Sequence, residues 1–238
     1  MTSVKLADIS YGPPGGSLLF NNLSLEIGTE RVGLIGPNGS GKTTLFYIIM
    51  GLLRPDKGAV LLNGRQVDDG RAWRQLRRQV GFLFQDADDQ LFSPTVLEDV
   101  GFGPLNIGYS ESEARQRAEA TLESLGLAGF EDRITHQLSG GEKKLVALAT
   151  ILVMAPDILL LDEPTNNLDP TTRKRLVAIL EKLNLPMVII SHDFDFLAKT
   201  TDVIYSLEQG HLHRSESSHL HSHPHAHPYG EHPHDHGG

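Results

Sequence analysis

The segment that most limits how this chain can fold is GPNGSGKTT, which runs from Gly36 to Thr44. A short apolar run at residues 31–35 precedes it, and a stretch typical of a helix follows at residues 42–53. Glycines let the backbone curl so that successive N–H groups point at an anion, and the start of a helix adds the positive end of its dipole. This order of strand, loop and helix predicts a site for nucleotide phosphates, the alternative being an ordinary glycine turn.

Two side chains of this loop suit the same chemistry. In a loop of this kind, Lys42 places its charge at the γ-phosphate and the Thr43 hydroxyl is placed to bind Mg²⁺. The residues expected to contact the nucleotide are Gly36, Pro37, Asn38, Gly39, Ser40, Gly41, Lys42, Thr43 and Thr44.

The remaining apolar patterns predict an α/β protein with a mixed sheet. Residues 4–11 and 18–27 alternate apolar and polar side chains around the turn GPPGG, which indicates an antiparallel β subdomain. From residue 95 to about 152 the pattern is helical, with Ser110 and Glu113 placed as a capping box, so we expect a helical subdomain inserted into the sheet. Continuous apolar runs, typical of parallel strands covered on both faces, lie at residues 158–161, 187–190 and 203–207.

The composition fits one large domain and argues against several classes of protein. With 238 residues, of which 39% are hydrophobic, the chain is long enough to bury a sizeable core. A formal net charge of -9 offers no broad basic surface, which argues against DNA or RNA as the main partner. No cysteine is present, so neither a disulfide nor a thiolate metal site can form. The longest apolar stretch, residues 145–155, is shorter than the roughly 20 residues that span a bilayer, so we expect another chain to cross any membrane involved.

Polar side chains follow several predicted strands, at the edge where ligands of open α/β sheets bind. Asp162 and Glu163 come directly after one apolar run, and Gln85 and His192 follow two others. Adjacent carboxylates in a strand point to opposite sides, so Asp162 and Glu163 suit different roles. The alternatives are two surface charges, a surface amide and a hydrogen-bonded core histidine.

The pentapeptide LSGGE, from Leu138 to Glu142, precedes another apolar stretch. Ser139 stands where a helix N-cap belongs, and Glu142, three residues on, completes a capping box. The pattern is therefore explained by a helix start. A helix N-terminus with exposed glycine N–H groups also binds anions, so a structural and a binding role are compatible.

GPNGSGKTT, LSGGE, ILLLDEP and an isolated histidine follow one another in this order, in which the chain resembles the ATP-binding cassette ATPases. The resemblance implies hydrolysis of ATP at a site shared by two subunits. In such a site, Ser139, Gly140 and Gly141 of one subunit bind the γ-phosphate of ATP held by the other. Asp169 would lie at the contact between the subunits. Tyr11 would stack on adenine, a core tyrosine being the alternative.

The same resemblance gives the residues at the sheet edge their roles. Asp162 would hold Mg²⁺, together with Thr43 and Gln85. Glu163 would polarise the water that attacks the γ-phosphate, and His192 would contact that phosphate. Gln85 would also link the site to the helical subdomain. ATP and Mg²⁺ are thus the expected ligands, and Glu163, His192 and Gln85 the expected catalytic residues.

The stretch DADDQLFSPTVLEDVGFGPLNIG, residues 86–108, resembles the ATPase subunits of energy-coupling factor importers, which serve uptake of cobalt, nickel and B-type vitamins. In relatives this region builds the groove that receives a helix from the membrane partner. We expect an acidic rim suited to a basic helix, the alternative being a solvated acidic face. The rim would consist of Asp86, Asp88, Asp89, Glu98 and Asp99.

After Gly210 the composition changes to histidine, proline, serine and glycine, which cannot bury a core and is expected to stay disordered. The predicted domains are therefore a cassette at residues 1–210 and a tail at residues 211–238. Neutral imidazoles suit nickel, cobalt, zinc and copper, so the tail is expected to bind divalent metal, without separating nickel from cobalt. Regularly spaced candidate ligands are His219, His221, His223, His225 and His227.

These features predict the ATP-hydrolysing subunit of a cobalt or nickel importer of the energy-coupling factor type, bound to the cytoplasmic face of the membrane. It would form a homodimer or pair with a second ATPase subunit, and bind a transmembrane coupling subunit and a substrate-binding membrane subunit. The alternatives are a vitamin importer of the same type with an incidental metal-binding tail, a soluble clamp on nucleic acid, and a metal-storage protein. The interval between Gln85 and Ser139 is too short for the long coiled coil of such clamps, and storage leaves the ATP motifs unexplained.

Overall fold

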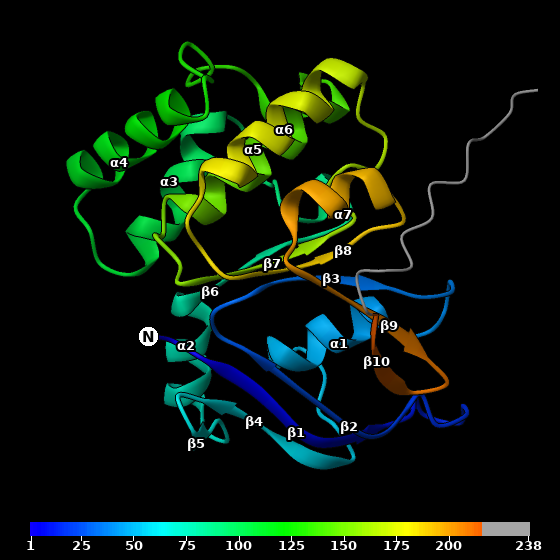
Figure 1. Cartoon of the computed structure of the whole chain (residues 1–238). Coiled ribbons are helices and arrows are strands. Elements are labelled where there is room, and N and C mark those ends of the chain that lie inside the picture. Colours follow the sequence, from blue (N-terminus) through cyan, green and yellow to red (C-terminus); the bar gives the residue numbers. More distant parts are fainter. Residues whose placement is uncertain (216–238) are drawn as a thin grey trace, which may run out of the picture.

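The computed structural model describes residues 1–215, which form two sheets with helices between and above them (Figure 1). The smaller sheet is antiparallel and consists of β1 (Val4–Tyr11), β2 (Phe20–Ile27), β4 (Lys57–Leu62) and β5 (Arg65–Gln66). Its strand order is β2-β1-β4-β5, so β1 and β2 form the predicted hairpin.

The larger sheet consists of β3 (Arg31–Ile35), β6 (Val80–Leu83), β7 (Ile158–Asp162), β8 (Met187–Ile190), β9 (Val203–Glu208) and β10 (His211–Ser215). The strand order is β10-β9-β3-β8-β7-β6, and every neighbouring pair is parallel except β10 with β9. Every residue of β7 and β8 is buried, as continuous apolar runs predict for strands covered on both faces.

The helices are α1 (Lys42–Ile49), α2 (Gly70–Gln79), α3 (Val96–Asn106), α4 (Glu111–Ser124), α5 (Gly140–Leu152), α6 (Pro170–Lys182) and α7 (Phe194–Thr200), with short 3₁₀ turns η1 (Ala87–Asp89) and η2 (Thr135–Gln137). In Figure 1, α1 lies between the two sheets, whereas α3 to α7 lie on the opposite side of the larger sheet. Within residues 1–215, no helix combines the length and apolarity needed to cross a membrane.

Two hydrophobic clusters fill these layers. Leu160 of β7 packs in the cluster between the sheets, which includes Phe46 of α1. Its neighbour Leu159 packs in the cluster beneath the helices, which includes Leu148 of α5. Successive side chains of a strand point to opposite faces, so one apolar run supplies both cores. The predicted α/β fold with a mixed sheet and an antiparallel sheet is confirmed.

The helices of the predicted helical region begin as the sequence indicates. Capping boxes form at Ser110 with Glu113 and at Ser139 with Glu142, which confirms both predictions. Thr95 and Glu98 form a third capping box, at the start of α3. Each box satisfies backbone N–H groups that the first turn of a helix cannot pair internally.

Three elements differ from the sequence prediction. The helices α2 and α7 were not expected, because α2 has a single buried residue, Leu76, and α7 is only seven residues long, so neither shows a clear apolar pattern. The expectation that the chain leaves the fold after Gly210 is wrong for five residues, since β10 continues the sheet at His211. This strand pairs antiparallel with β9, from Glu208 to Ile204, through a tight turn at Gly210.

Candidate functional site

A cleft of about 510 Å³ opens where strands of the larger sheet end and α1 begins. Its wall brings together the phosphate loop, the acidic pair after β7, the glutamine after β6 and the histidine after β8. The lining residues are Leu19, Asn38, Gly39, Gly41, Lys42, Thr43, Thr44, Gln85, Asp162, Glu163, Asn166, Ile190 and His192. Residues separated by more than a hundred positions thus meet at the sheet edge where open α/β folds bind ligands.

The phosphate loop is held in a shape that two glycines make possible. Gly36 and Gly41 have φ angles of 152° and 100°, a region that favours glycine. A Cβ atom on Gly36 would stand 2.5 Å from the carbonyl oxygen of Leu207, and one on Gly41 would stand 2.7 Å from Leu19 Cδ2. Strand β9 and the segment before β2 therefore close around the loop from two sides and leave no room for a side chain.

Lys42 turns its ammonium group back over this loop. The Lys42 Nζ atom donates to the carbonyl oxygens of Gly36 at 2.8 Å and Pro37 at 3.0 Å. Burial lowers the pKa of Lys42, while Glu163 and Asp162 act in the opposite direction. The lysine charge is thereby placed among loop amides and beside two carboxylates, where a nucleotide phosphate would be the natural additional partner.

Asp162 is almost fully buried, with 1% of its surface exposed, yet neither carboxylate oxygen has a hydrogen-bond partner among residues 1–215. Burial raises the pKa of Asp162, and the nearby Thr43 hydroxyl, Lys144 and Lys42 lower it again in part. The Thr43 hydroxyl is near enough to act on the charge without completing a hydrogen bond. A buried carboxylate with unpaired oxygens ordinarily has a partner, and Mg²⁺ prefers this type of oxygen ligand. The arrangement fits the predicted Mg²⁺ position beside Thr43 and Gln85.

Glu163 lies against His192. The Glu163 Oε1 and His192 Nε2 atoms are 3.3 Å apart, and the side chains are 7% and 53% exposed. Burial raises the pKa of Glu163, while His192 lowers it in part. Glu163 has a φ angle of 44°, unusual for a residue with a side chain, and its N–H donates to the Ile190 carbonyl at 2.9 Å. This backbone conformation, fixed by β8, directs the carboxylate into the cleft.

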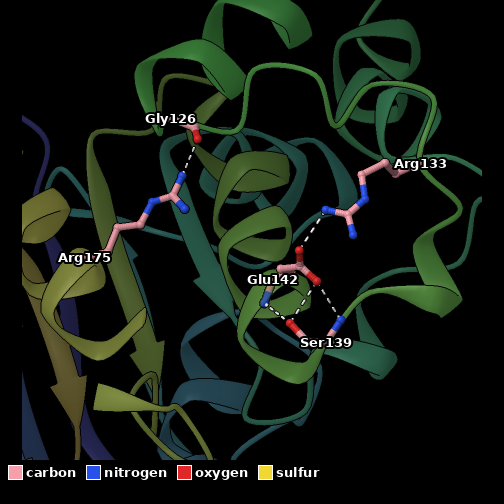
Figure 2. A network of polar contacts seen from close by, with 5 residues as sticks. All are labelled: Gly126, Arg133, Ser139, Glu142 and Arg175. Carbon is pink, nitrogen blue, oxygen red and sulfur yellow. Dashed lines mark hydrogen bonds and ion pairs between the residues drawn. The ribbon is translucent and has the colours of Figure 1, made fainter. Parts of the chain in front are cut away.

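The start of α5 forms a separate polar group, which we call the signature corner and define as Arg133, Ser139 and Glu142 (Figure 2). The N–H and the hydroxyl of Ser139 donate to Glu142 Oε2 at 2.8 Å and 2.9 Å. The Arg133 Nη1 atom donates to Glu142 Oε1 at 2.7 Å. The Ser139 backbone and the Arg133 side chain lower the pKa of Glu142, so both carboxylate oxygens are paired and charged.

Several predicted site residues do not line the cleft of their own chain. Within the phosphate loop, Gly36, Pro37 and Ser40 are absent from the lining. Outside the loop, the residues that do not line it are Tyr11, Ser139, Gly140, Gly141 and Asp169. Asp169 caps α6 and accepts the Thr172 hydroxyl at 2.6 Å, while a Cβ on Gly141 would stand 3.0 Å from Thr172 Cγ2. The starts of α5 and α6 therefore adjoin each other, away from the phosphate loop.

Tyr11, the predicted adenine platform, packs against the core between the sheets, and its ring centroid is 6.4 Å from that of Phe20. Leu19 lines the cleft instead, and its N–H donates to the Tyr11 carbonyl at 2.8 Å. The five histidines from His219 to His227 that were predicted to bind metal lie outside the described residues.

The predicted acidic rim is wrong for Asp99, which is 3% exposed. Its carboxylate accepts the N–H groups of Phe92 and Ser93 and the hydroxyl of Thr135 at 2.9–3.0 Å. Other members of the proposed rim are also engaged within the chain: Asp86 caps η1, Asp88 pairs with Lys143, and Glu98 caps α3. Helix caps, hydrogen bonds and an ion pair within the chain, which a count of charges does not reveal, thus engage four of the five acidic residues.

A second groove of about 270 Å³ lies beside β6, and Phe84 and Gln90 are among the residues that line it. Apolar side chains and two arginines line it, including Leu52, Phe82, Met154, Arg77 and Arg78. Helix α3 borders this groove, since a Cβ on Gly103 would stand 2.6 Å from Met154 Sδ. Three exposed apolar residues also lie on or near α3, namely Phe92, Phe102 and Leu105.

The sequence prediction also missed Lys144, which is buried beside Gln85 and contributes charge to the cleft. Little in the sequence signals this burial, because Lys144 directly follows Glu142 and Lys143 and stands at the polar end of the mostly apolar stretch from Leu145 to Leu152. A lysine at such a position is either exposed or has a buried partner.

Comparison with known proteins agrees with this nucleotide-binding architecture. The family model described as "ABC transporter" matches residues 20–166. A protein of Nitratidesulfovibrio vulgaris, provisionally named an ABC transporter ATP-binding protein, is 51% identical over 97% of this chain and 86% of its own length. The energy-coupling factor transporter ATP-binding protein EcfA of Methanothermobacter thermautotrophicus is 44% identical, over 88% of this chain and 69% of its own length.

A solved structure shows the same fold. The structure of cbiO1 from Clostridium perfringens, described as part of the ABC transporter complex cbiONQ, superimposes with a TM-score of 0.78 at 34% identity. The match covers 88% of this chain and 86% of that one. The fold and the cleft define a P-loop nucleotide-binding protein. The chain belongs to the ABC transporter ATP-binding family, and it is an ATPase of that class.

Proposed function

We propose that this chain is the ATP-hydrolysing subunit of an energy-coupling factor importer for a transition-metal ion, cobalt or nickel. The observation that carries the ATPase part is the single cleft that joins the phosphate loop with unpaired buried carboxylate oxygens of Asp162 and Glu163. The similarity to EcfA supports the energy-coupling factor class. The ten histidines after Gly210 favour a metal ion over a vitamin.

Each polar residue of the cleft would have its own role in ATP hydrolysis. The loop amides and Lys42 would hold the β- and γ-phosphates. Glu163 would accept a proton from the attacking water, a role that its burial supports because a raised pKa makes a carboxylate a better base near neutral pH. The His192 side chain, half exposed beside Glu163, would reach the γ-phosphate.

The predicted cofactor fits the same residues. Asp162, Thr43 and Gln85 would hold Mg²⁺, which neutralises the charge that develops on the phosphates. The unpaired oxygens of Asp162 are the evidence for this fit, since they are buried at a carboxylate whose pKa burial raises.

The signature corner would complete the site of a second subunit. Ser139, Gly140 and Gly141 do not line the cleft of their own chain, so a role at a phosphate requires another copy or a related ATPase. In a dimer, the helix start of one subunit would face the phosphate loop of the other, with the dipole of α5 and the glycine N–H groups directed at the γ-phosphate. Asp169, at the neighbouring helix start, would lie at the same contact.

Membrane partners would bind at the second groove. Its apolar lining and the adjoining exposed side chains of Phe92, Phe102 and Leu105 suit a helix with an apolar face. A transmembrane coupling subunit would supply this helix, and a substrate-binding membrane subunit would complete the importer. The ATPase would then lie at the cytoplasmic face of the membrane, without crossing it.

The assignment is tested by purifying the chain from membranes with its attached partners and measuring uptake of labelled nickel, labelled cobalt and labelled B vitamins in vesicles. We expect ATP-dependent uptake of one of the two metals, abolished by Lys42→Ala. Uptake of a vitamin alone would instead support the vitamin importer, for which the tail is incidental. A complex that transports nothing while the chain hydrolyses ATP would refute the importer and leave the ATPase standing.

A further inference from the structure

The structure contains a buried lysine that the proposed reaction does not use. Lys144 lies in the second turn of α5 and is 4% exposed. Its Nζ atom donates to the carbonyl oxygen of Gln85 at 2.6 Å and to that of Phe84 at 3.3 Å. Burying an ammonium group is costly unless it is paired, and a residue that only fills a core is ordinarily apolar.

Nearby carboxylates offset part of the cost of burying the Lys144 charge. Burial lowers the pKa of Lys144, and Asp86, Asp162 and Glu163 act in the opposite direction. Two of these carboxylates belong to the cleft. The ammonium group therefore stands between the catalytic carboxylates and the backbone that carries Gln85.

Further contacts fasten the same segment to the same helix. We call residues 84–90 the glutamine segment. Lys143 donates to Asp88 Oδ1 at 2.6 Å, and Gln90 Nε2 donates at 2.8 Å both to the carbonyl of Ala147 and to the hydroxyl of Thr150. The glutamine segment is thus tied to α5 at its beginning, middle and end.

These contacts differ in their burial and in the part of the glutamine segment that they hold. Asp88 in the Lys143 pair is 66% exposed, and exposed ion pairs contribute little. Gln90 holds the far end of the segment. Among the described residues, Lys144 supplies the side-chain hydrogen bond to the backbone of Gln85 itself, from a site shielded from water. A charged hydrogen bond in such a place is stronger than an exposed one.

We propose that Lys144 is a positioning residue that makes Gln85 follow α5. The proposal rests on the proposed function, in which Gln85 serves the ATP of its own subunit and the start of α5 contacts the ATP of the other. Lys144 then links the two ATP sites within one chain. When ATP bound to the phosphate loop of the partner contacts the start of α5 and shifts this helix, Gln85 moves with the helix. The two sites respond to each other because one buried ammonium group bridges their elements.

The test measures amide hydrogen exchange in the full chain with Glu163→Gln, which removes the proposed base so that ATP persists. Peptides covering residues 84–90 and 139–146 are followed with and without ATP and Mg²⁺. In the parent, which here is the Glu163→Gln chain, ATP with Mg²⁺ should slow exchange in both peptides by roughly tenfold as the dimer closes. With Lys144→Met added, the 139–146 peptide should still slow tenfold, whereas the 84–90 peptide should change by less than roughly twofold.

Two further variants separate positioning from simple loss of structure. Lys143→Met is the matched control on the same helix and should leave both responses as in the parent. Lys144→Arg keeps a charged donor and should restore the response of the glutamine segment, which a purely space-filling role would not predict. If Lys144→Met does not fold, Lys144→Gln serves the same comparison, because its shorter neutral side chain cannot bond both carbonyls.

The outcomes distinguish this proposal from the one on which it rests. Equal slowing of both peptides in the Lys144→Met chain would overturn the role of Lys144. Slowing of neither peptide in the parent would instead contradict the ATP-clamped dimer. An effect of Lys143→Met as large as that of Lys144→Met would show that the charge of α5 as a whole acts on the segment, and the assignment to Lys144 would fail.

Discussion

The cleft and the signature corner are both polar, but they meet their hydrogen-bonding needs in opposite ways. In the cleft, Asp162 and Glu163 are buried with three carboxylate oxygens that no group among residues 1–215 pairs, and burial raises the pKa of each residue. At the signature corner, Glu142 is paired on both oxygens and its pKa is lowered. The cleft is therefore incomplete without a ligand. The signature corner is a helix start whose carboxylate is already fully paired, so a ligand that binds there satisfies no missing hydrogen bond.

The largest expected effect concerns the base proposed for the cleft. Glu163→Gln should lower ATP hydrolysis by roughly 10²–10⁴-fold, the range for loss of a general base, because the amide cannot accept a proton. Binding of ATP, measured by equilibrium dialysis, should persist. Glu181→Gln, an exposed change on α6, is the control and should hydrolyse ATP at the parent rate. Hydrolysis by the Glu163→Gln chain at the parent rate would remove Glu163 from its role.

The signature corner is expected to act only across a dimer. Ser139→Tyr should reduce hydrolysis by roughly 10²-fold, as for loss of a donor to a reacting anion, while leaving nucleotide binding to the phosphate loop intact. Ser110→Tyr removes an equivalent capping box from α4 and controls for the lost cap.

Mixing Ser139→Tyr chains with inactive Lys42→Ala chains sharpens this test. Each mixed dimer has one site with an intact phosphate loop and an intact serine, so activity should return in the mixture. A verified monomer that hydrolyses ATP at full rate with Ser139→Tyr would end the shared-site model.

The cleft and the start of α6, which adjoins the signature corner, should also respond oppositely to loss of a carboxylate charge in the chain without nucleotide. Asp162→Asn removes a buried charge and should raise the midpoint of thermal unfolding at pH 7 by roughly 2–4 °C, at the cost of stabilisation by ATP with Mg²⁺. Asp169→Asn weakens a helix cap and should lower the midpoint. Calorimetry measures both, and a fall in the Asp162→Asn midpoint would contradict an unpaired buried charge.

The stability linked to Asp162 and to Asp169 should depend on pH in opposite directions. The pKa of Asp162 is raised on folding, so the stability linked to this group is lost as pH rises through its folded pKa. The pKa of Asp169 is lowered, mainly by the Thr172 hydroxyl, so its contribution is present above the unfolded pKa and is lost as pH falls through the folded one.

The smallest effect concerns Arg133, which neutralises Glu142 beside the expected phosphate position. Arg133→Ala should weaken the ATP-dependent activity by roughly twofold to fivefold, the range of a partly exposed ion pair, because a bare carboxylate repels the phosphate. Arg133→Ala combined with Glu142→Gln should recover most of the loss, since no charge then needs a partner. Steady-state kinetics over a range of ATP concentrations decides between these outcomes.

Local signals predicted much of this molecule. The phosphate loop, the hairpin of β1 and β2, and the capping boxes at Ser110 and Ser139 depend on residues close in sequence, and the fold class follows from apolar runs. Strand ends placed Asp162, Glu163, Gln85 and His192 at one sheet edge, and they do line one cleft.

The parts that were missed depend on contacts over long distances. Lys144 and Gln85 are 59 positions apart, so nothing near either residue indicates their hydrogen bond. Asp99 looked like a surface charge because its partners, two loop N–H groups and the Thr135 hydroxyl, are defined only by how α3 and η2 pack. The edge strand β10 depends on β9 for its pairing, and its polar sequence gives no sign of this.

The glycine loop is enclosed by Leu207 of β9 on one side and by Leu19, directly before β2, on the other. A shortened version of this chain that starts at β3 would keep every residue expected to touch the phosphates. It would nevertheless lose the support against Gly41, and we expect its affinity for ATP to fall. Fragments chosen by motif boundaries alone would therefore underestimate the affinity of this enzyme for ATP, because the first strands of the chain support the phosphate loop.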